Sequence, residues 1–303
     1  MSAVSRIDRT FGIVRSVVTY YGVPLRARRL RRFYSQFVTS GSLCFDVGAH
    51  AGNRVRCWLQ LKARVVAIEP QPDFVRLLRF LYGRNKNVEI VAAALGRARG
   101  RGTLLTSERT PTVTTLSPEW IDEVRTDPRF AGVRWAPDRP VEILTLQALI
   151  ERHGLPRFVK IDVEGFEAEV LAGLEVAVPF LSFEYLPAAR ATALACIDRL
   201  EQLGVYRYNH SSGESHRLEL ETWVDADDAR RFIEALPPDA PSGDVYASLT
   251  SPRNRLARAA RPLPLTRAQC GVSGLSSWNL QPFESASWPR CAARMTSGEL
   301  TAA

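Results

Sequence analysis

Cysteine and histidine are scarce in this 303-residue sequence, and their spacing excludes several kinds of site. The five cysteines include no Cys-x-x-Cys pair, and the four histidines stand in no zinc-ligand spacing with them. The sequence therefore argues against a disulfide framework and a structural zinc site. An odd, scattered set of cysteines is typical of reduced thiols, so we predict a cytoplasmic protein.

Long apolar runs are also missing. No stretch approaches the roughly 18 uninterrupted apolar residues that a membrane-spanning helix needs. Near the N-terminus, Arg6, Asp8, Arg9 and Arg15 interrupt the apolar core that a signal peptide would require. We therefore expect no transmembrane segment and no secretion signal.

Acidic residues are rare at the two ends of the chain. Residues 1–40 contain eight Arg and one Asp, and residues 251–303 contain seven Arg and two Glu. Because the whole chain carries a formal charge of +8, residues 41–250 are net acidic. A nucleic-acid-binding domain normally has a basic face on its folded part. The charge distribution therefore predicts no nucleic-acid partner.

The sequence predicts three regions. These are an Arg-rich helical extension (1–40), a main domain (41–250) and a disordered or loosely packed tail (251–303). Within the extension, apolar residues recur at helical spacing at Val4, Ile7, Phe11, Val14, Val18 and Tyr21. This predicted helix packs on the main domain, or it makes a peripheral contact with an anionic membrane surface, helped by the arginines between 26 and 32.

Short buried strands alternate with amphipathic helices from residue 42 onward. The predicted strands are 43–48, 63–70, 87–95, 157–163 and 179–185, then 205–211, 218–224 and 244–249. The predicted helices are 53–61, one opening at Pro72, one after Thr145, and 165–174, 188–203 and 226–236. This alternation predicts an α/β fold with a doubly wound, mostly parallel sheet that binds ligands at the carboxyl ends of its strands. Residues 96–140 are predicted to be irregular, because the segment is rich in Gly and Pro.

The first predicted strand ends in the glycine turn Asp-Val-Gly-Ala-His-Ala-Gly, residues 46–52. Its Gly48-x-x-x-Gly52 spacing departs from the Gly-x-Gly-x-x-Gly turn that cradles a pyrophosphate. The carboxylate of Asp46 would also repel a phosphate, but it suits the cationic side of S-adenosylmethionine. We expect His50, inside the turn, to lie near this cofactor as a polar contact or a general base.

Glu69 follows the second predicted strand, 21 residues after Gly48. An acid at this position can accept hydrogen bonds from both ribose hydroxyls of a nucleotide. Both NAD and S-adenosylmethionine require this contact, so Glu69 indicates a nucleotide without discriminating between them.

Two acids, Asp162 and Glu164, end the fourth predicted strand in Lys-Ile-Asp-Val-Glu-Gly. Acids near a buried sheet edge require a partner, which would be the amino-acid portion of the cofactor, a substrate hydroxyl or a cation. Alternatively, Glu164 only stabilises the N-terminus of the following helix. Glu184 ends the next strand in the equivalent position. The segment 103–120 is predicted to close over the substrate, with contacts at Thr114, Thr115 and Ser117.

The motifs FDVGAHAGN, VVAIEPQPDFVRLL and, most specifically, KIDVEGFEAEVLAG resemble the FkbM family of S-adenosylmethionine-dependent methyltransferases over about residues 40–187. The resemblance implies a Rossmann-like, seven-stranded sheet with its last strand antiparallel, and O-methylation of natural products or sugars. It carries over Asp46, Gly48, Gly52 and Glu69 as cofactor residues. It also implies that Asp162 and Glu164 are the acids of the KIDVEG motif.

Two departures from the family pattern stand out. His50 replaces a common Asn, and Ala92 and Ala93 stand where many members have a polar residue near the adenine.

The sequence thus predicts a methyltransferase with S-adenosylmethionine as cofactor and a small-molecule, sugar or natural-product hydroxyl as acceptor. Asp162 and Glu164 are the predicted catalytic acids, with Asp162 also in contact with the cofactor and no metal required. The general base remains open among Glu164, Asp162 and His50. The alternatives are a non-catalytic methyltransferase-like binding module and a nicotinamide-dependent oxidoreductase.

Overall fold

The computed structural model describes residues 24–107 and 110–250, which belong to one compact unit. The predicted helix between residues 3 and 22 and the predicted tail, 251–303, lie outside the described residues. No described helix is long and apolar enough to cross a membrane. Because the predicted helix and tail lie outside the described residues, the domain boundaries at 40 and 250 stay predictions.

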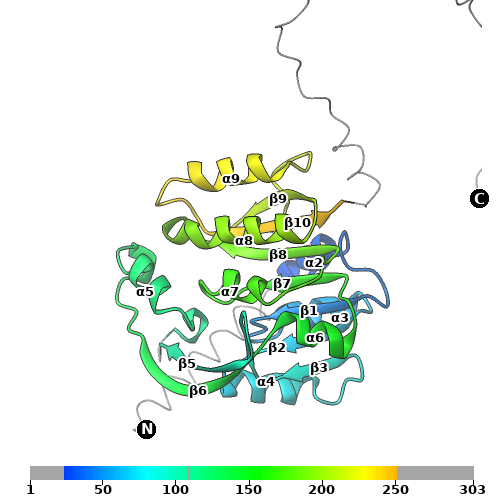
Figure 1. The fold of residues 1–303 in the computed structure, drawn as a ribbon. Coiled ribbons are helices and arrows are strands. Elements are labelled where there is room, and N and C mark those ends of the chain that lie inside the picture. The colour runs from blue at the N-terminus through cyan, green and yellow to red at the C-terminus, as the bar shows by residue number, and fades with distance from the viewer. Residues whose placement is uncertain (1–23, 108–109, 251–303) are drawn as a thin grey trace, which may run out of the picture. The chain divides into compact units, whose positions relative to one another are not determined.

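Seven strands form the central sheet (Figure 1). They are β1 (Leu43–Val47), β2 (Arg64–Ile68), β3 (Val88–Val91), β7 (Phe158–Ile161), β8 (Phe180–Tyr185), β9 (Tyr206–Ser212) and β10 (Gly243–Leu249). The spatial order is β3-β2-β1-β7-β8-β10-β9. β10 is antiparallel to both of its neighbours, and the other pairings are parallel. This confirms the predicted seven-stranded, mostly parallel sheet and its antiparallel last strand.

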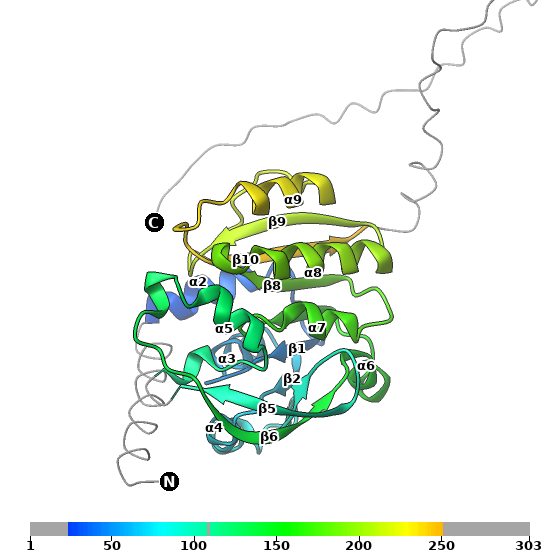
Figure 2. The same ribbon diagram turned by 60° about the vertical axis from the view of Figure 1, so that its left-hand side comes forward.

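Helices cover both faces of the sheet (Figure 2). One face packs against α6 (Leu146–His153), α7 (Glu167–Ala172), α8 (Arg190–Leu203) and α9 (Ala226–Ala235). The other face packs against α2 (Pro24–Tyr34), α3 (Asn53–Gln60) and α4 (Pro72–Tyr82). The short helix η3 (Pro187–Ala189) leads into α8. Because β1, β2 and β7 are buried on both sides, they are almost entirely apolar, as expected for parallel strands.

A second, three-stranded sheet corrects the prediction that residues 96–140 are irregular. It consists of β4 (Ala94–Leu95), β5 (Gly100–Thr106) and β6 (Ala136–Leu144) in the order β4-β6-β5. Between β5 and β6 lie η1 (Pro111–Val113), α5 (Pro118–Val124) and η2 (Pro128–Phe130). The strands were missed because the glycines of β5 and the prolines of β6 hide any period of two, and because their pairing is non-local.

The predicted strand at 218–224 is also wrong. In the described residues this segment forms one isolated bridge with β9, between Tyr208 and Val224, and one further backbone hydrogen bond of 2.9 Å, from the amide of Glu219 to the oxygen of His210. Leu218 and Trp223 instead pack on the α2–α3 side of the domain. The apolar residues of the segment therefore face the core without forming a ladder.

Candidate active site

A cavity of about 130 Å³ lies at the carboxyl ends of β1, β2 and β7. It is the position at which an open parallel sheet binds its ligand. Its wall includes Gly48 and His50 from the turn after β1, Glu69 after β2, and Asp162 and Glu164 after β7. The register explains this convergence, because Asp46 in β1 stands beside Ala67 in β2 and Lys160 in β7. The three strands consequently end at the same level.

The turn after β1 requires glycine at position 48. Gly48 has φ +80°, and a Cβ atom there would lie 1.9 Å from the backbone oxygen of Asp162. The turn is held against β2 by two hydrogen bonds of 3.0 Å, from the amides of Gly48 and Ala49 to the oxygen of Ile68. Gly52 has φ +79° and caps the N-terminus of α3, outside the cavity wall. Gly48 therefore shapes the cavity directly, whereas Gly52 turns the chain into the helix.

Glu69 lines the cavity although its residue is only 2% exposed. One carboxylate oxygen accepts a 2.8 Å hydrogen bond from the amide of His50, and the other accepts one of 2.8 Å from the amide of Gln71. Burial raises the pKa of Glu69 to about 7, against these two hydrogen bonds. The carboxylate is thus held in a fixed orientation by the backbone.

Asp46 lies behind the cavity wall, because its residue is fully buried. Its Oδ1 atom accepts a 2.7 Å hydrogen bond from Nε of Arg54. Burial raises the pKa of Asp46, although the charge of Arg54 opposes this shift. We expected the Asp46 carboxylate to face a cationic ligand. In the structure it binds Arg54 instead, and Arg54 is the residue that lines the cavity.

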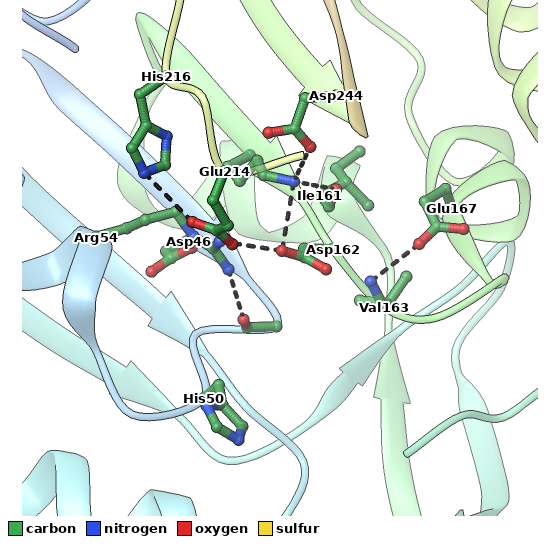
Figure 3. Close-up of polar contacts among 12 residues, drawn as sticks. Asp46, His50, Arg54, Ile161, Asp162, Val163, Glu167, Glu214, His216 and Asp244 are labelled. Carbon is green, nitrogen blue, oxygen red and sulfur yellow. Dashed lines mark hydrogen bonds and ion pairs between the residues drawn. The ribbon is translucent and has the colours of Figure 1, made fainter. Parts of the chain in front are cut away.

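Arg54 is the central cation of the site (Figure 3). In addition to Asp46, its guanidinium donates to Oδ2 of Asp162 at 3.0 Å and to the backbone oxygen of Gly48 at 3.1 Å. Arg54 itself lines the cavity. The sequence interpretation missed this residue. Its one signal was a basic side chain in the first turn of α3, where the helix dipole disfavours positive charge.

Lys160 extends this row of alternating charges along the sheet. Its buried ammonium lies 2.7 Å from Oδ1 of Asp244 in β10 and 3.4 Å from Oδ2 of Asp162. Burial would raise the pKa of Asp162, but the charges of Lys160 and Arg54 lower it to about 2. Asp162 is therefore ionised throughout the physiological range. The signal for Lys160 was a single charged residue inside an otherwise apolar strand.

His50 packs against the ring of Phe74, with 3.8 Å between the ring centroids. Its backbone has φ +47°, which is uncommon for a residue other than glycine. Burial, followed by the charge of Arg54, lowers the pKa of His50 to about 3. At neutral pH the imidazole is uncharged and weakly basic, which argues against the general-base alternative.

Three acids meet where β7 and β8 end. Asp162, Glu164 and Glu184 each place a carboxylate oxygen within 4.8 Å of the others. Burial, followed by the charges of Asp162 and Glu167, raises the pKa of Glu164 well above its usual range. Burial and the charge of Glu164 do the same to the pKa of Glu184. Glu164 and Glu184 therefore hold protons far more tightly than Asp162 does.

The same three carboxylates are a candidate set of metal ligands. Carboxylate oxygens suit a hard divalent cation. The ammonium of Lys160 already lies beside Asp162, so the protein itself supplies a cation to this cluster of three carboxylates. The prediction that no metal is required remains to be tested.

The segment 110–117 forms one wall of the cavity through Thr112, Thr114, Thr115 and Leu116. The hydroxyl of Thr115 donates to the backbone oxygen of Glu164 at 2.6 Å. The hydroxyl of Ser117 instead caps α5, accepting a 3.0 Å hydrogen bond from the amide of Trp120. Thr115 thereby fixes the backbone of Glu164, whose φ is +53°.

A second cavity, of about 200 Å³, adjoins the first at Glu164, which lines both. Its wall combines the carboxylates of Glu164 and Glu184 with the rings of Trp120 and Phe130. Arg129 also lines it, but Asp127 holds this guanidinium at 2.6 Å. Glu164 is thus the residue that the two cavities have in common.

Comparison with known proteins identifies the family. The profile described as Methyltransferase FkbM domain matches residues 46–235, which is more than half of the chain. A search of curated proteins finds no match.

Solved methyltransferase structures are similar at low identity. Precorrin-6y C5,15-methyltransferase from Geobacter metallireducens is 13% identical, with 74% of this chain and 87% of that chain covered and a TM-score of 0.36. A TehB-like SAM-dependent methyltransferase from Corynebacterium glutamicum is 9% identical, with coverages of 73% and 88% and a TM-score of 0.38. Aeropyrum pernix fibrillarin in complex with S-adenosyl-L-methionine is 10% identical, with coverages of 70% and 68% and a TM-score of 0.36.

The assignment rests on the family match together with the strand order and the cavity at the carboxyl ends of the strands. The chain belongs to the FkbM family of methyltransferases, and its cofactor is S-adenosylmethionine.

Proposed function

We propose that the protein methylates a hydroxyl oxygen of a small molecule, sugar or natural product. The observation that carries this proposal is the pair of adjoining cavities that share Glu164. A methyl transfer requires the cofactor and the acceptor to meet at one point, and the two compartments provide that arrangement. A carboxyl group with a raised pKa at the junction suits the removal of a hydroxyl proton.

The residues of the first cavity fit S-adenosylmethionine. Glu69 offers carboxylate oxygens to the ribose hydroxyls. Arg54 and Asp162, a cation and an anion side by side, match the carboxylate and the ammonium of the amino-acid portion. The apolar part of the wall, including Ala93 and Leu104, suits the adenine. Gly48 and His50 line the remaining edge at the turn.

Asp46 and Gly52 support this cofactor site indirectly. Asp46 fixes Arg54 through the 2.7 Å hydrogen bond, and Gly52 sets the start of α3. We assign both to positioning. Asp162 is assigned to cofactor binding, because a carboxyl group with a pKa of about 2 is a weak base.

When bound, the cofactor supplies a methyl group on a positively charged sulfur, which needs no further activation. The protein therefore has to align the acceptor oxygen with that methyl group, and good alignment alone is worth effective molarities on the order of 10⁵ M. The carboxylate of Glu164 would accept the hydroxyl proton as the acceptor oxygen takes the methyl group from sulfur, which would leave a methyl ether and S-adenosylhomocysteine.

The test separates cofactor binding from chemistry. Calorimetric titration with S-adenosylhomocysteine, with NAD as the control ligand, comes first. Binding of NAD in place of S-adenosylhomocysteine would favour the oxidoreductase alternative. A radiolabelled methyl-transfer assay over a panel of hydroxylated acceptors follows.

The Glu164→Gln variant should bind S-adenosylhomocysteine normally but lose roughly 10²- to 10⁴-fold in turnover, because the proton acceptor is missing. Glu169→Gln, at a half-buried acid of the following helix α7 that pairs with Arg97 outside both cavities, is the matched control and should remain active. Cofactor binding without methyl transfer to any acceptor would favour the non-catalytic module. Full activity of Glu164→Gln would rule out Glu164 as the base.

A further inference from the structure

Helix α2 carries five arginines and no acidic residue in eleven positions. All five arginines are exposed: Arg26, Arg28, Arg29, Arg31 and Arg32. Within residues 24–107 and 110–250, none of their guanidinium groups forms an ion pair with a carboxylate. Elsewhere in this part of the chain, exposed arginines such as Arg76 and Arg152 are paired with acids. Within the part of the chain that the structure describes, no carboxylate therefore compensates the basic charge of α2.

The helix presents these charges on a rigid support. Leu30, Phe33 and Tyr34 form its buried side. Phe33 packs edge-on against Tyr246 of β10, with 5.2 Å between the ring centroids, and Tyr34 packs against Trp58 of α3 at 5.4 Å. At 100° per residue, Arg28 and Arg32 point away from this buried side. The exposed side of α2 is consequently a fixed basic surface.

The N-terminal part of α2 lies near the cofactor cavity. Arg26 and Leu30 of α2 line a shallow hollow together with Asn53 and Glu214. Asn53 and Glu214 also line the cofactor cavity. A partner that contacts Arg26 at the N-terminal end of α2 would therefore lie near the cofactor cavity.

We propose that the exposed arginines of α2 dock the protein on an anionic lipid surface, so that the active site lies beside the lipid headgroups. Charge complementarity carries the proposal, because each basic side chain near such a surface strengthens binding by roughly fivefold. The preceding sequence supplies a second, apolar signal, since apolar residues repeat at helical spacing from Val4 to Tyr21. Stable peripheral binding normally requires two such signals.

An RNA partner fits this surface less well. Proteins that bind single-stranded RNA stack bases on exposed aromatic side chains. Both aromatic residues of α2, Phe33 and Tyr34, are buried against the sheet. The exposed side of the helix carries positive charge but no aromatic ring for base stacking. Such a surface suits a layer of anionic lipid headgroups.

The test is flotation of the full-length protein with vesicles. We compare phosphatidylcholine vesicles with vesicles that contain about one third phosphatidylglycerol, at about 50 mM and about 500 mM NaCl, since salt screens exposed charges. Wild-type protein should bind only the anionic vesicles and should be released at high salt. A labelled single-stranded RNA is titrated in parallel.

The decisive variant replaces Arg28, Arg29, Arg31 and Arg32 by Gln. Its partition onto anionic vesicles should fall by several-hundred-fold, at roughly fivefold per arginine. The matched control replaces four exposed arginines on other elements, Arg76, Arg97, Arg152 and Arg217, by Gln. It has the same net charge and should still bind. Circular dichroism and binding of S-adenosylhomocysteine confirm that both variants are folded.

Three results would overturn the proposal. They are failure of the wild-type protein to bind anionic vesicles at low salt, an equal loss in the control variant, or arginine-dependent binding of RNA without binding of vesicles. None of these results depends on the identity of the methyl acceptor, so the proposed reaction is tested separately.

Discussion

Replacement of Arg54 by Met tests whether one guanidinium holds the cofactor site together. In the folded protein Arg54 binds the carboxylates of Asp46 and Asp162 and the backbone oxygen of Gly48. Met has a similar length but no charge. The substitution would leave the fully buried Asp46 without its cation, whereas Asp162 would keep Lys160. The damage should therefore centre on Asp46.

The expected loss is about 3–5 kcal/mol in the free energy of unfolding, which is typical when one partner of a buried ion pair is removed. The loss should depend on pH. Without Arg54, the pKa of the buried Asp46 carboxyl rises further above its unfolded value. Stability is then retained at low pH, where the carboxyl is protonated, and is lost as the pH rises. The variant should thus be closer to wild type at about pH 5 than at about pH 7.5.

Urea unfolding of the cofactor-free protein at both pH values is the assay. The double variant Arg54→Met/Asp46→Asn should recover at least about half of the loss at the higher pH, because no buried charge is left unpaired. Arg152→Met breaks an exposed pair with Glu89 and should cost only about 0.2–1 kcal/mol. The reasoning is refuted if Arg54→Met is as stable as Arg152→Met, or if the effects of Arg54→Met and Asp46→Asn simply add.

Further predictions concern three single positions. Gly48→Ala should destabilise the protein far more than Gly41→Ala in urea unfolding, because both have φ near +80° but only Gly48 has an atom within 4 Å of the added Cβ. Glu69→Ala should weaken calorimetric binding of S-adenosylhomocysteine by roughly 10- to 100-fold, since charged hydrogen bonds are lost. Burial raises the pKa of Glu69 to about 7 in the folded protein. Its contribution to stability is therefore present below the unfolded pKa and is lost as the pH rises through 7. The free energy of unfolding of Glu69→Ala should accordingly decline less over that pH range than that of the wild-type protein. The value of kcat/KM should rise with pH through the raised pKa of Glu164, and Glu164→Gln should remove that rise, whereas an unchanged pH profile would contradict the assignment of the base.

The local sequence was sufficient for much of the main sheet. The strand around Phe45 and the strand around Val66 are short apolar runs bounded by turns, and the structure places β1 and β2 there. Thr145 and Gly154 predicted the bounds of a helix, and α6 begins and ends at these residues. These elements could be predicted because a run of buried strand residues and the capping of a helix both depend on residues close together in the chain.

The sequence also located the acids of the site but not their partners. Glu69, Asp162 and Glu164 follow strands whose ends must meet at one sheet edge, so their convergence was predictable. Arg54 and Lys160 were missed, because a basic residue on a helix or strand has no pattern that identifies its distant carboxylate. Only the tertiary structure pairs Arg54 with Asp162, 108 residues away.

The sequence by itself thus determined the family, the cofactor and the positions of most main strands along the chain, since these are expressed in contiguous motifs and local periodicity. The tertiary structure decided which carboxylates are charged. Asp46 and Asp162 are compensated by Arg54 and Lys160, whereas Glu164 and Glu184 lie close to one another, and burial and neighbouring carboxylates raise the pKa of both. The physical reason is that the charge state of a buried acid is set by desolvation and by neighbours within a few ångströms, and those neighbours come from distant parts of the chain.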